Sequence, residues 1–138
     1  MKNRVLKIIF VFFIGISILE INAQTPIIPK ETLGKPLVTL GNFNPIDTVL
    51  LEDLLSQNGL TIKEENGAIS KIVEFRVLLL FKIKGIAEFS TNNINFISHR
   101  KDYFKTILKS GDMILIDSIK ILNPLFSGYA NPITIYLK

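Results

Sequence analysis

The sequence predicts a mainly β fold: an antiparallel β-sandwich-like single domain of the α+β class, with two short helices and a preceding signal peptide. Three observations support this expectation. Residues 71–84 carry an unbroken apolar face at every second position, several shorter segments have the same character, and only two segments show helical spacing. A period of two is typical of a strand, and many strands with few helices favour an antiparallel sheet.

The segment 71–84 is the longest expected strand, and we expect the rest of the domain to fold around it. Its other face is polar at first and carries Leu78 and Leu80 in the middle, which favours a central position. At about 3.3 Å per residue the segment would extend roughly 46 Å, more than the roughly 30 to 35 Å width of a domain of this size. It must therefore bend, bulge or fray. Its apolar face consists of Val73, Phe75, Val77, Leu79, Phe81 and Ile83.

Shorter strands are expected on both sides of this segment. They are rich in Ile, Leu, Val and Thr, and turn residues separate them. Met113–Ile116 and Ser118–Leu122 are either two strands or one bent strand. The expected strands are Pro36–Leu40, Leu60–Lys63, Ile86–Ser90, Met113–Ile116, Ser118–Leu122 and Ile133–Leu137.

Two amphipathic helices are expected to cover the sheet. Leu50–Gln57 places four leucines on one side. The second helix runs from His99 to Lys109, with Ser98 as its N-cap and Gly111 at its stop. Its apolar arc would hold Tyr103, Phe104, Ile107 and Leu108, opposite Lys101, Lys105 and Lys109.

Residues 1–23 have the three-part layout of a secretory signal peptide. Three cations lie within the first seven residues, residues 8–19 are apolar, and Ala23 is a small residue at a cleavage position before Gln24. Glu20 ends the apolar run short of the about 20 residues that a membrane span needs. We therefore expect an exported protein with no stable membrane anchor after cleavage.

Cleavage after Ala23 would leave a domain of modest charge. It removes 23 of 138 residues, among them three cations and one anion, so the formal net charge falls from +4 to +2. Residues 24–35 hold two prolines and no periodicity, which indicates an extended leader, and residues 36–138 form the expected β domain. Because the chain has no cysteine, a disulfide framework and a lipid-anchored cysteine are excluded.

Residues suited to catalysis are few. His99 is the only histidine, and we interpret it as a surface residue rather than a metal ligand or catalytic base. Two acidic groupings, Glu64 with Glu65 and Asp112 with Asp117, are interpreted as solvated turn carboxylates. The sequence contains no nucleophile elbow and no glycine-rich phosphate loop. We therefore expect no enzymatic activity, no cofactor and no metal.

The lysine face of the second helix is the feature best suited to an anionic partner, because cations on one face attract phosphates. A net charge near +2 and an export signal instead favour a solvated helix face. No nucleic acid partner is expected.

Several motifs follow one another from about Pro36 to the end of the chain. A helix over 98–109 precedes Gly111-Asp112, an apolar strand and Ile119-Lys120, and residues 132–138 form a closing strand. Upstream, residues 35–41 (Lys-Pro-Leu-Val-Thr-Leu-Gly) precede a leucine helix that ends in Asn58-Gly59. This layout resembles the C-terminal domain of GldM, the envelope protein of gliding motility and type IX secretion in Bacteroidetes.

The resemblance implies a non-enzymatic β domain that binds a protein partner in the cell envelope. Its location would be periplasmic, associated with the outer membrane, or secreted. GldM itself has a transmembrane helix and several periplasmic domains, whereas this chain is expected to have a cleavable signal and one domain, so motor coupling is not implied.

The loop Asn123–Pro132 is the candidate partner-binding segment. It carries Leu125, Phe126 and Tyr129 where polar turn residues would be expected, and it lacks the Asp-Gly and arginine that are usual in the family. Leu125 is expected to fold back onto the domain. Phe126 and Tyr129 are expected to stand out as aromatic anchors for a partner. The alternative function is an exported carrier that holds a small apolar ligand between sheet and helix.

Overall fold

The computed structural model describes residues 35–64, 69–124 and 126–138, all of which belong to one compact unit, Glu31–Lys138. Of these residues, 48% lie in strands and 17% in helices, in two sheets with three short helices, so the fold is mainly β as expected. The expected signal peptide, residues 1–23, and the leader up to residue 34 lie outside the described residues. None of the described helices has the length and apolar character needed to cross a membrane.

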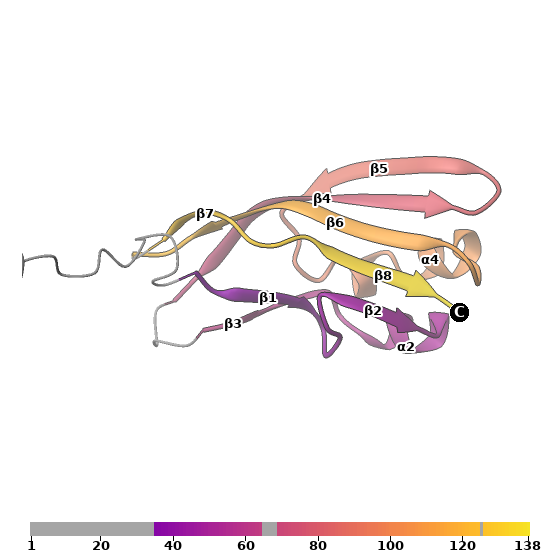
Figure 1. Cartoon of the computed structure of the whole chain (residues 1–138), viewed down its shortest axis with the longest axis horizontal. Coiled ribbons are helices and arrows are strands. Elements are labelled where there is room, and N and C mark those ends of the chain that lie inside the picture. The colour runs from indigo at the N-terminus through magenta and orange to yellow at the C-terminus, as the bar shows by residue number, and fades with distance from the viewer. Residues whose placement is uncertain (1–34, 65–68, 125) are drawn as a thin grey trace, which may run out of the picture. The chain divides into compact units, whose positions relative to one another are not determined.

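Strands dominate the chain order within the described residues (Figure 1). The elements are β1 (Leu37–Leu40), β2 (Ile46–Val49), α2 (Leu51–Ser56), β3 (Leu60–Lys63), β4 (Lys71–Phe81), β5 (Gly85–Thr91), α3 (Phe96–His99), α4 (Lys101–Ile107), β6 (Met113–Leu122), β7 (Ser127–Tyr129) and β8 (Ile133–Leu137).

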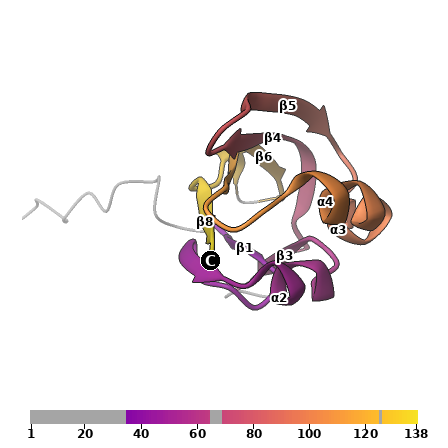
Figure 2. The same ribbon diagram turned by 90° about the vertical axis from the view of Figure 1, so that its right-hand side faces the viewer.

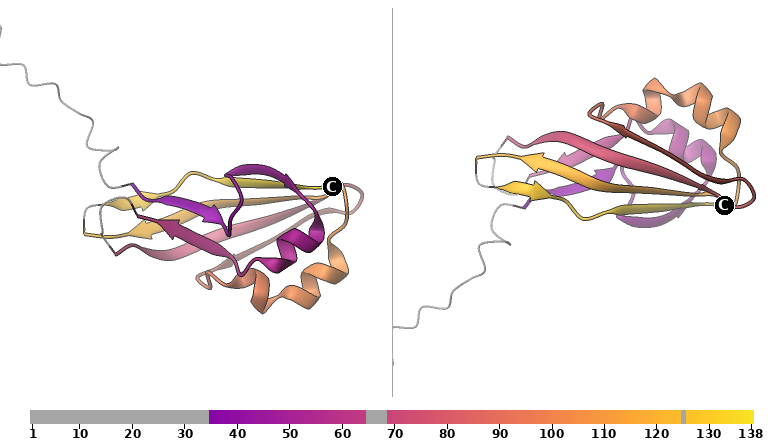
Figure 3. Two further views of the ribbon diagram at one scale, coloured as in Figure 1. Left: turned by 90° about the horizontal axis from the view of Figure 1, so that it is seen from below. Right: turned by 90° about the horizontal axis from the view of Figure 1, so that it is seen from above.

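The larger sheet has the strand order β2-β8-β6-β4-β5, and β7 pairs with β6 on the same edge as β8. Its pairs are antiparallel except β2–β8, which is parallel, so this sheet is mixed rather than antiparallel throughout. β1 and β3 form a separate antiparallel pair. The larger sheet curves, and the helices and the β1–β3 pair lie on its concave side (Figures 2 and 3).

A hydrophobic core fills the space between the concave face and these covering elements. Its rings connect the layers: Phe75 of β4 meets Phe96 of α3 edge-on at 5.4 Å between centroids, and Phe96 meets Phe104 of α4 at 6.0 Å. The sheet contributes buried side chains from its three central strands, namely Ile72, Phe75, Val77, Leu79, Ile114, Ile116, Ile119, Ile121, Ile133, Ile135 and Leu137.

Strand β6 changes the set of residues that face the core part-way along its length. Ile114 and Ile116 point inward before the change, and Ile119 and Ile121 point inward after it. Between these pairs Ser118 has a positive φ of 51°, and β6 carries one residue more than β4. An extra residue of this kind is a β-bulge, which shifts the alternation by one position. The two segments expected here are therefore one bent strand.

Strand β4 contains the compensating irregularity, between Ile72 and Glu74. The expected bend or bulge is confirmed, but before the bulge the expected core residue, Val73, was wrong. Ile72 is buried and Val73 is 36% exposed, because the bulge reverses the alternation. Ile83 lies in the turn after β4 and is 91% exposed, and Phe81 is only partly buried. Phe75, Val77 and Leu79 are buried as expected.

The second expected helix is divided into α3 and α4 at Arg100. Ser98 lies inside α3, where its hydroxyl donates to the Asn95 carbonyl at 3.0 Å, so it is not the N-cap. The helical residues begin earlier because the amides of Ile97 and Ser98 both donate to the Asn58 carbonyl, at 3.1 Å each. Tyr103 is 47% exposed and does not belong to the apolar arc. Three short helices therefore replace the expected two.

Two strands were not expected. β2 lies at one edge of the larger sheet, and β7 lies within the segment Asn123–Pro132 that was interpreted as a loop. Both are very short, with four and three residues, so neither gives a clear alternating pattern. The helix expected at Leu50–Gln57 and the other short strands are confirmed to within one residue.

Asp112 is not the solvated turn carboxylate that was expected. It is 6% exposed, and its two carboxylate oxygens accept hydrogen bonds from the amides of Lys82 and Lys109, at 2.9 Å each. The neighbouring Gly111 has φ of 91°, and its amide donates to the Leu137 carbonyl at 2.7 Å. Asp112 therefore ties the β4–β5 turn and the residues after α4 to the start of β6.

The bulge in β4 can be tested with two neighbouring substitutions. Ile72→Ala is expected to lower the free energy of unfolding by about 2 to 5 kcal/mol, because it leaves a cavity in the core. Val73→Ala, one residue away on the exposed side, is expected to lower it by less than about 1 kcal/mol. Urea denaturation of both variants measures the difference. Equal losses, or a larger loss at Val73, would contradict the assignment of Ile72 to the core side and Val73 to the exposed side of β4.

Candidate partner-binding surface

The convex face of the larger sheet, here called the outer face, has no described helix or strand packed over it (Figures 1 to 3). An antiparallel sheet that faces water on one side usually places polar side chains there. Here two rows run across the strands and are largely apolar. The first row is Ile86, Leu80, Met113, Tyr136 and Thr48, and the second is Glu88, Leu78, Leu115, Thr134 and Ile46.

The centre and the edges of these rows differ in exposure. The central leucines and Met113 are half-buried by their neighbours, whereas Ile86 at one edge is 67% exposed and Ile46 at the other edge is 72% exposed. Tyr136 of β8 is 46% exposed. Contiguous apolar surface of this kind marks interaction sites on soluble proteins. The outer face is thus the principal candidate for partner binding in the described part of the chain.

A charged row borders the apolar rows. Arg76 of β4 donates from Nε and Nη2 to the two carboxylate oxygens of Asp117 on β6, at 2.7 Å each. Its Nη1 lies 3.5 Å from the carboxylate of Glu88 on β5. The hydrogen bonds from Arg76 lower the pKa of Asp117 below its usual 3.8, and the same bonds raise the pKa of Arg76. Both groups are therefore charged at neutral pH and hold each other in place.

A cavity of about 280 Å³ lies beside this charged row. Tyr129 of β7 lines it and is 59% exposed, and Tyr129 pairs directly opposite Lys120 of β6. Side chains opposite each other in a sheet point to the same face, so Tyr129 extends the outer face beyond the bulge. The cavity is lined by Glu74, Phe75, Arg76, Ser90, Ser118, Lys120 and Tyr129.

The three residues singled out in the loop Asn123–Pro132 have different outcomes. Tyr129 is exposed, as expected for a partner-binding anchor. Phe126 is half-buried and packs against the core, so the expectation that it stands free does not hold. Its ring lies over Gly128, where an added Cβ would come within 2.9 Å of it. Leu125 lies outside the described residues. Whether any of the three contacts a partner stays a hypothesis.

The remaining candidate residues are not brought together into a catalytic arrangement. Asp112 is buried on its backbone donors, whereas Asp117 pairs with Arg76 on the outer face, so these two do not form an acid/base pair. Glu64 is exposed and accepts a hydrogen bond from the Ser70 amide, and Glu65 lies outside the described residues. No cluster of three acidic or histidine side chains that could hold a metal ion occurs among the residues described.

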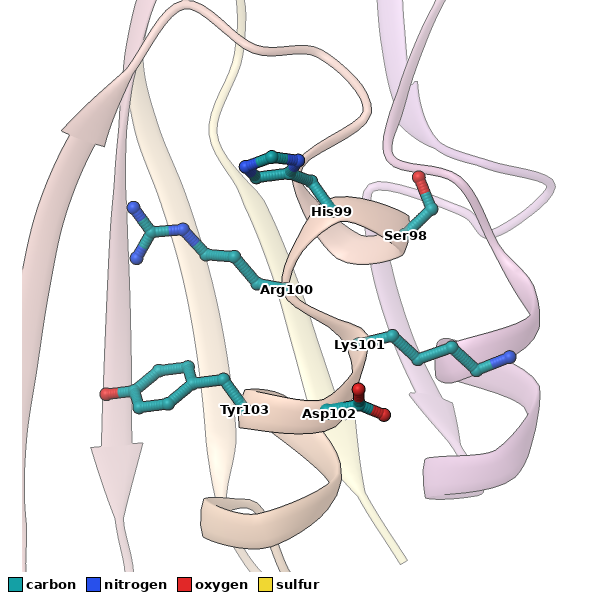
Figure 4. Close-up of a pocket in the computed structure, with 6 residues that line it drawn as sticks. All are labelled: Ser98, His99, Arg100, Lys101, Asp102 and Tyr103. Atoms are coloured by element: carbon teal, nitrogen blue, oxygen red, sulfur yellow. The ribbon is translucent and has the colours of Figure 1, made fainter.

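A second cavity, of about 360 Å³, lies at the junction of α3 and α4 (Figure 4). His99 is exposed there, together with Arg100 and Lys101. Figure 4 shows Arg100 and Tyr103 extending toward the strands on one side, while Lys101 extends toward α2 on the other. The other lysines of the expected stripe, Lys105 and Lys109, are exposed as well.

No protein-family model matches this chain, and no curated protein matches it either. The resemblance to the C-terminal domain of GldM therefore stays a prediction from the sequence.

The Arg76–Asp117 pair predicts an acid-sensitive contribution to stability. Because the pKa of Asp117 is lowered in the folded state, its contribution is complete above the usual carboxyl pKa of 3.8 and is lost as the pH falls through the lower folded value. The wild-type chain should therefore lose more unfolding free energy between pH 5 and pH 2.5 than Asp117→Asn. Urea denaturation at several pH values measures this.

A double-mutant cycle assigns the effect to the pair. In an Arg76→Gln background, Asp117→Asn should no longer change the acid dependence. A full effect of Asp117→Asn in that background would place its cause elsewhere.

Proposed function

We propose that this chain is a non-enzymatic, exported protein-binding domain of the bacterial cell envelope, associated with gliding motility or type IX secretion. The observation that supports it best is the apolar outer face, bordered by the Arg76–Asp117 pair and by Tyr129. An apolar centre with a polar border and an exposed tyrosine is the usual composition of a protein interface.

The size of the outer face fits a modest interface. Measured between centres, five strands about 4.8 Å apart span roughly 19 Å and three rows about 6.8 Å apart span roughly 14 Å, which gives about 270 Å². A standard interface buries about 800 Å² on each partner. The outer face alone would therefore be too small, and the adjoining segment Asn123–Pro132 with Tyr129 would complete it. A partner for this surface would present apolar side chains flanked by both charges.

The finer features of the proposal come from the sequence. They are a sandwich-like domain related to the C-terminal domain of GldM, a signal peptide over residues 1–23, and a location in the periplasm, at the outer membrane or outside the cell. The motif order from about Pro36 to the end of the chain supports the relationship, and the short apolar run over residues 8–19 supports export.

The carrier alternative has less support. A site for an apolar small molecule is normally a pocket lined by apolar side chains. The two cavities described above are instead lined mostly by polar and charged residues, and aromatic rings pack between the sheet and the helices. The protein-binding function is therefore the one we propose.

The outer face is expected to govern capture of an envelope protein. Tyr129→Ser and Tyr136→Ser remove two exposed aromatic side chains at opposite ends of the face, and each should reduce capture with little change in melting temperature. The measurement is affinity capture with mass spectrometry, using the processed chain as bait in envelope extracts, next to thermal denaturation of each variant. Phe126→Ser should instead lower the melting temperature, because that ring packs on the core.

Leu37→Ser is the matched control, since it removes an exposed apolar side chain on β1, a strand of the separate β1–β3 pair and not of the larger sheet. Capture that survives both tyrosine changes, or that is lost equally with Leu37→Ser, would contradict the proposal. Recovery of a bound small molecule instead of a protein partner would favour the carrier.

Processing gives an independent check of export. Intact-mass analysis of the native protein should show an N-terminus at Gln24, because Ala23 ends the signal-like segment. A native chain that retains Met1 and sits in the inner membrane would contradict the signal-peptide assignment.

A further inference from the structure

The edge of the larger sheet formed by β5 is a second candidate binding surface, because it carries backbone donors and acceptors that are not paired. β5 is the last strand in the sheet order and pairs only with β4. Within the described residues, no backbone hydrogen bond joins Gly85–Thr91 to any other element. Alternate amide and carbonyl groups of an edge strand point away from its neighbour, so β5 presents a row of free donors and acceptors.

Most of the usual protection of an edge strand is missing from β5. Natural edges are blunted by proline, by charged side chains and lysine above all, by a bulge or by short length. β5 contains neither proline nor lysine, runs for seven residues, and pairs with β4 in continuous register without a bulge; Glu88 is its one charged residue. The opposite edge strand, β2, has only four residues. A weakly protected edge of this length is therefore better explained by a partner that uses it.

Arg100 indicates which kind of side chain an added strand should carry. Its guanidinium lies over the ring of Phe89 on β5, 4.3 Å from the centroid. It is exposed, and in the described part of the chain no carboxylate lies within ion-pair distance of it. Figure 4 shows Arg100 and Tyr103 extending to the same side, toward the strands. A strand added beyond β5 would place every second side chain on the side of the sheet where Arg100 lies.

We propose that the β5 edge accepts an extended segment of a partner protein as an additional strand, and that an Asp or Glu of this segment pairs with Arg100. The backbone hydrogen bonds would supply affinity, and the carboxylate would fix the register. This inference concerns the sheet edge, goes beyond the proposed function, and does not depend on the envelope partner of the outer face.

A second copy of this chain is a poorer occupant than a different protein. A symmetric antiparallel pair centred on β5 would set Glu88 opposite the same residue of the other copy, and like charges directly opposite destabilise a sheet. The residues of β5 that alternate with Glu88 toward the core side are Ala87, Phe89 and Thr91, which offer no carboxylate to Arg100.

The test uses a display library of random twelve-residue peptides as the probe, screened against the whole processed chain. Enriched peptides should alternate β-branched or aromatic residues and carry Asp or Glu at one fixed position. Arg100→Gln should weaken binding of an enriched peptide by about tenfold or more, as expected for loss of a charge-assisted hydrogen bond. Lys101→Gln is the matched control and should change binding less than about twofold, because that side chain extends away toward α2.

Backbone N-methylation of the peptide distinguishes strand addition from other binding modes, because it removes N–H donors that only an added strand would use. Methyl groups on alternate residues should abolish binding, and those on the residues between them should be tolerated. Tyr129→Ser should leave peptide binding unchanged, which separates this surface from the outer face. The proposal is overturned if no acidic extended peptide is enriched, if N-methylation has no alternating effect, if Lys101→Gln weakens binding as much as Arg100→Gln, or if the chain self-associates through β5.

Discussion

The pairing of β4 with β6 is the constraint on which the remainder of the domain depends. β4 carries β5 on its other edge, and β6 carries β8 and β7, so an error in this pairing would displace every strand of the larger sheet. A slip of one residue would turn the inward side chains outward. The two bulges prevent that outcome. β4 has one extra residue on one side of the Glu74–Lys120 pair and β6 has one extra residue on the other side, so the apolar residues of both strands stay on the core side.

The same bulges organise the outer face. Asp117 immediately precedes Ser118, whose positive φ marks the bulge in β6, and there it lies opposite Arg76 of β4. Bulges commonly redirect a side chain or end a regular stretch of pairing. On one side of this point the outer face is apolar, and on the other it carries Glu74, Lys120 and Tyr129. One backbone irregularity thus separates an apolar area from a polar one on a single sheet.

Sequence patterns were sufficient to predict strands, helices and their buried residues where alternation or helical spacing persists over several residues. Phe75, Val77 and Leu79 could be placed in the core because each contributes to a regular period-two run. The phase change at Ile72 could not, because Ile72 and Val73 are equally apolar and only the pairing with β6 decides between them. The positive φ of Ser118 could not be predicted from the sequence, since serine uncommonly adopts one. The roles of Asp112 and Arg100 were missed because each makes a contact to a different element, Asp112 to the amide of Lys82 and Arg100 to the ring of Phe89, and no local sequence pattern indicates such a contact.

The two proposed surfaces share the β4–β5 hairpin but use different groups of it. Binding at one surface therefore does not exclude binding at the other. Glu88 faces the Arg76–Asp117 pair on the outer side, and the adjacent Phe89 supports Arg100 on the core side. Adding a strand to β5 would use backbone groups that point along the sheet, whereas the outer face uses side chains that point away from it. Arg76 is already held in a bidentate pair on the central strands, so its position does not depend on β5. One domain of this size could therefore hold two partners at once.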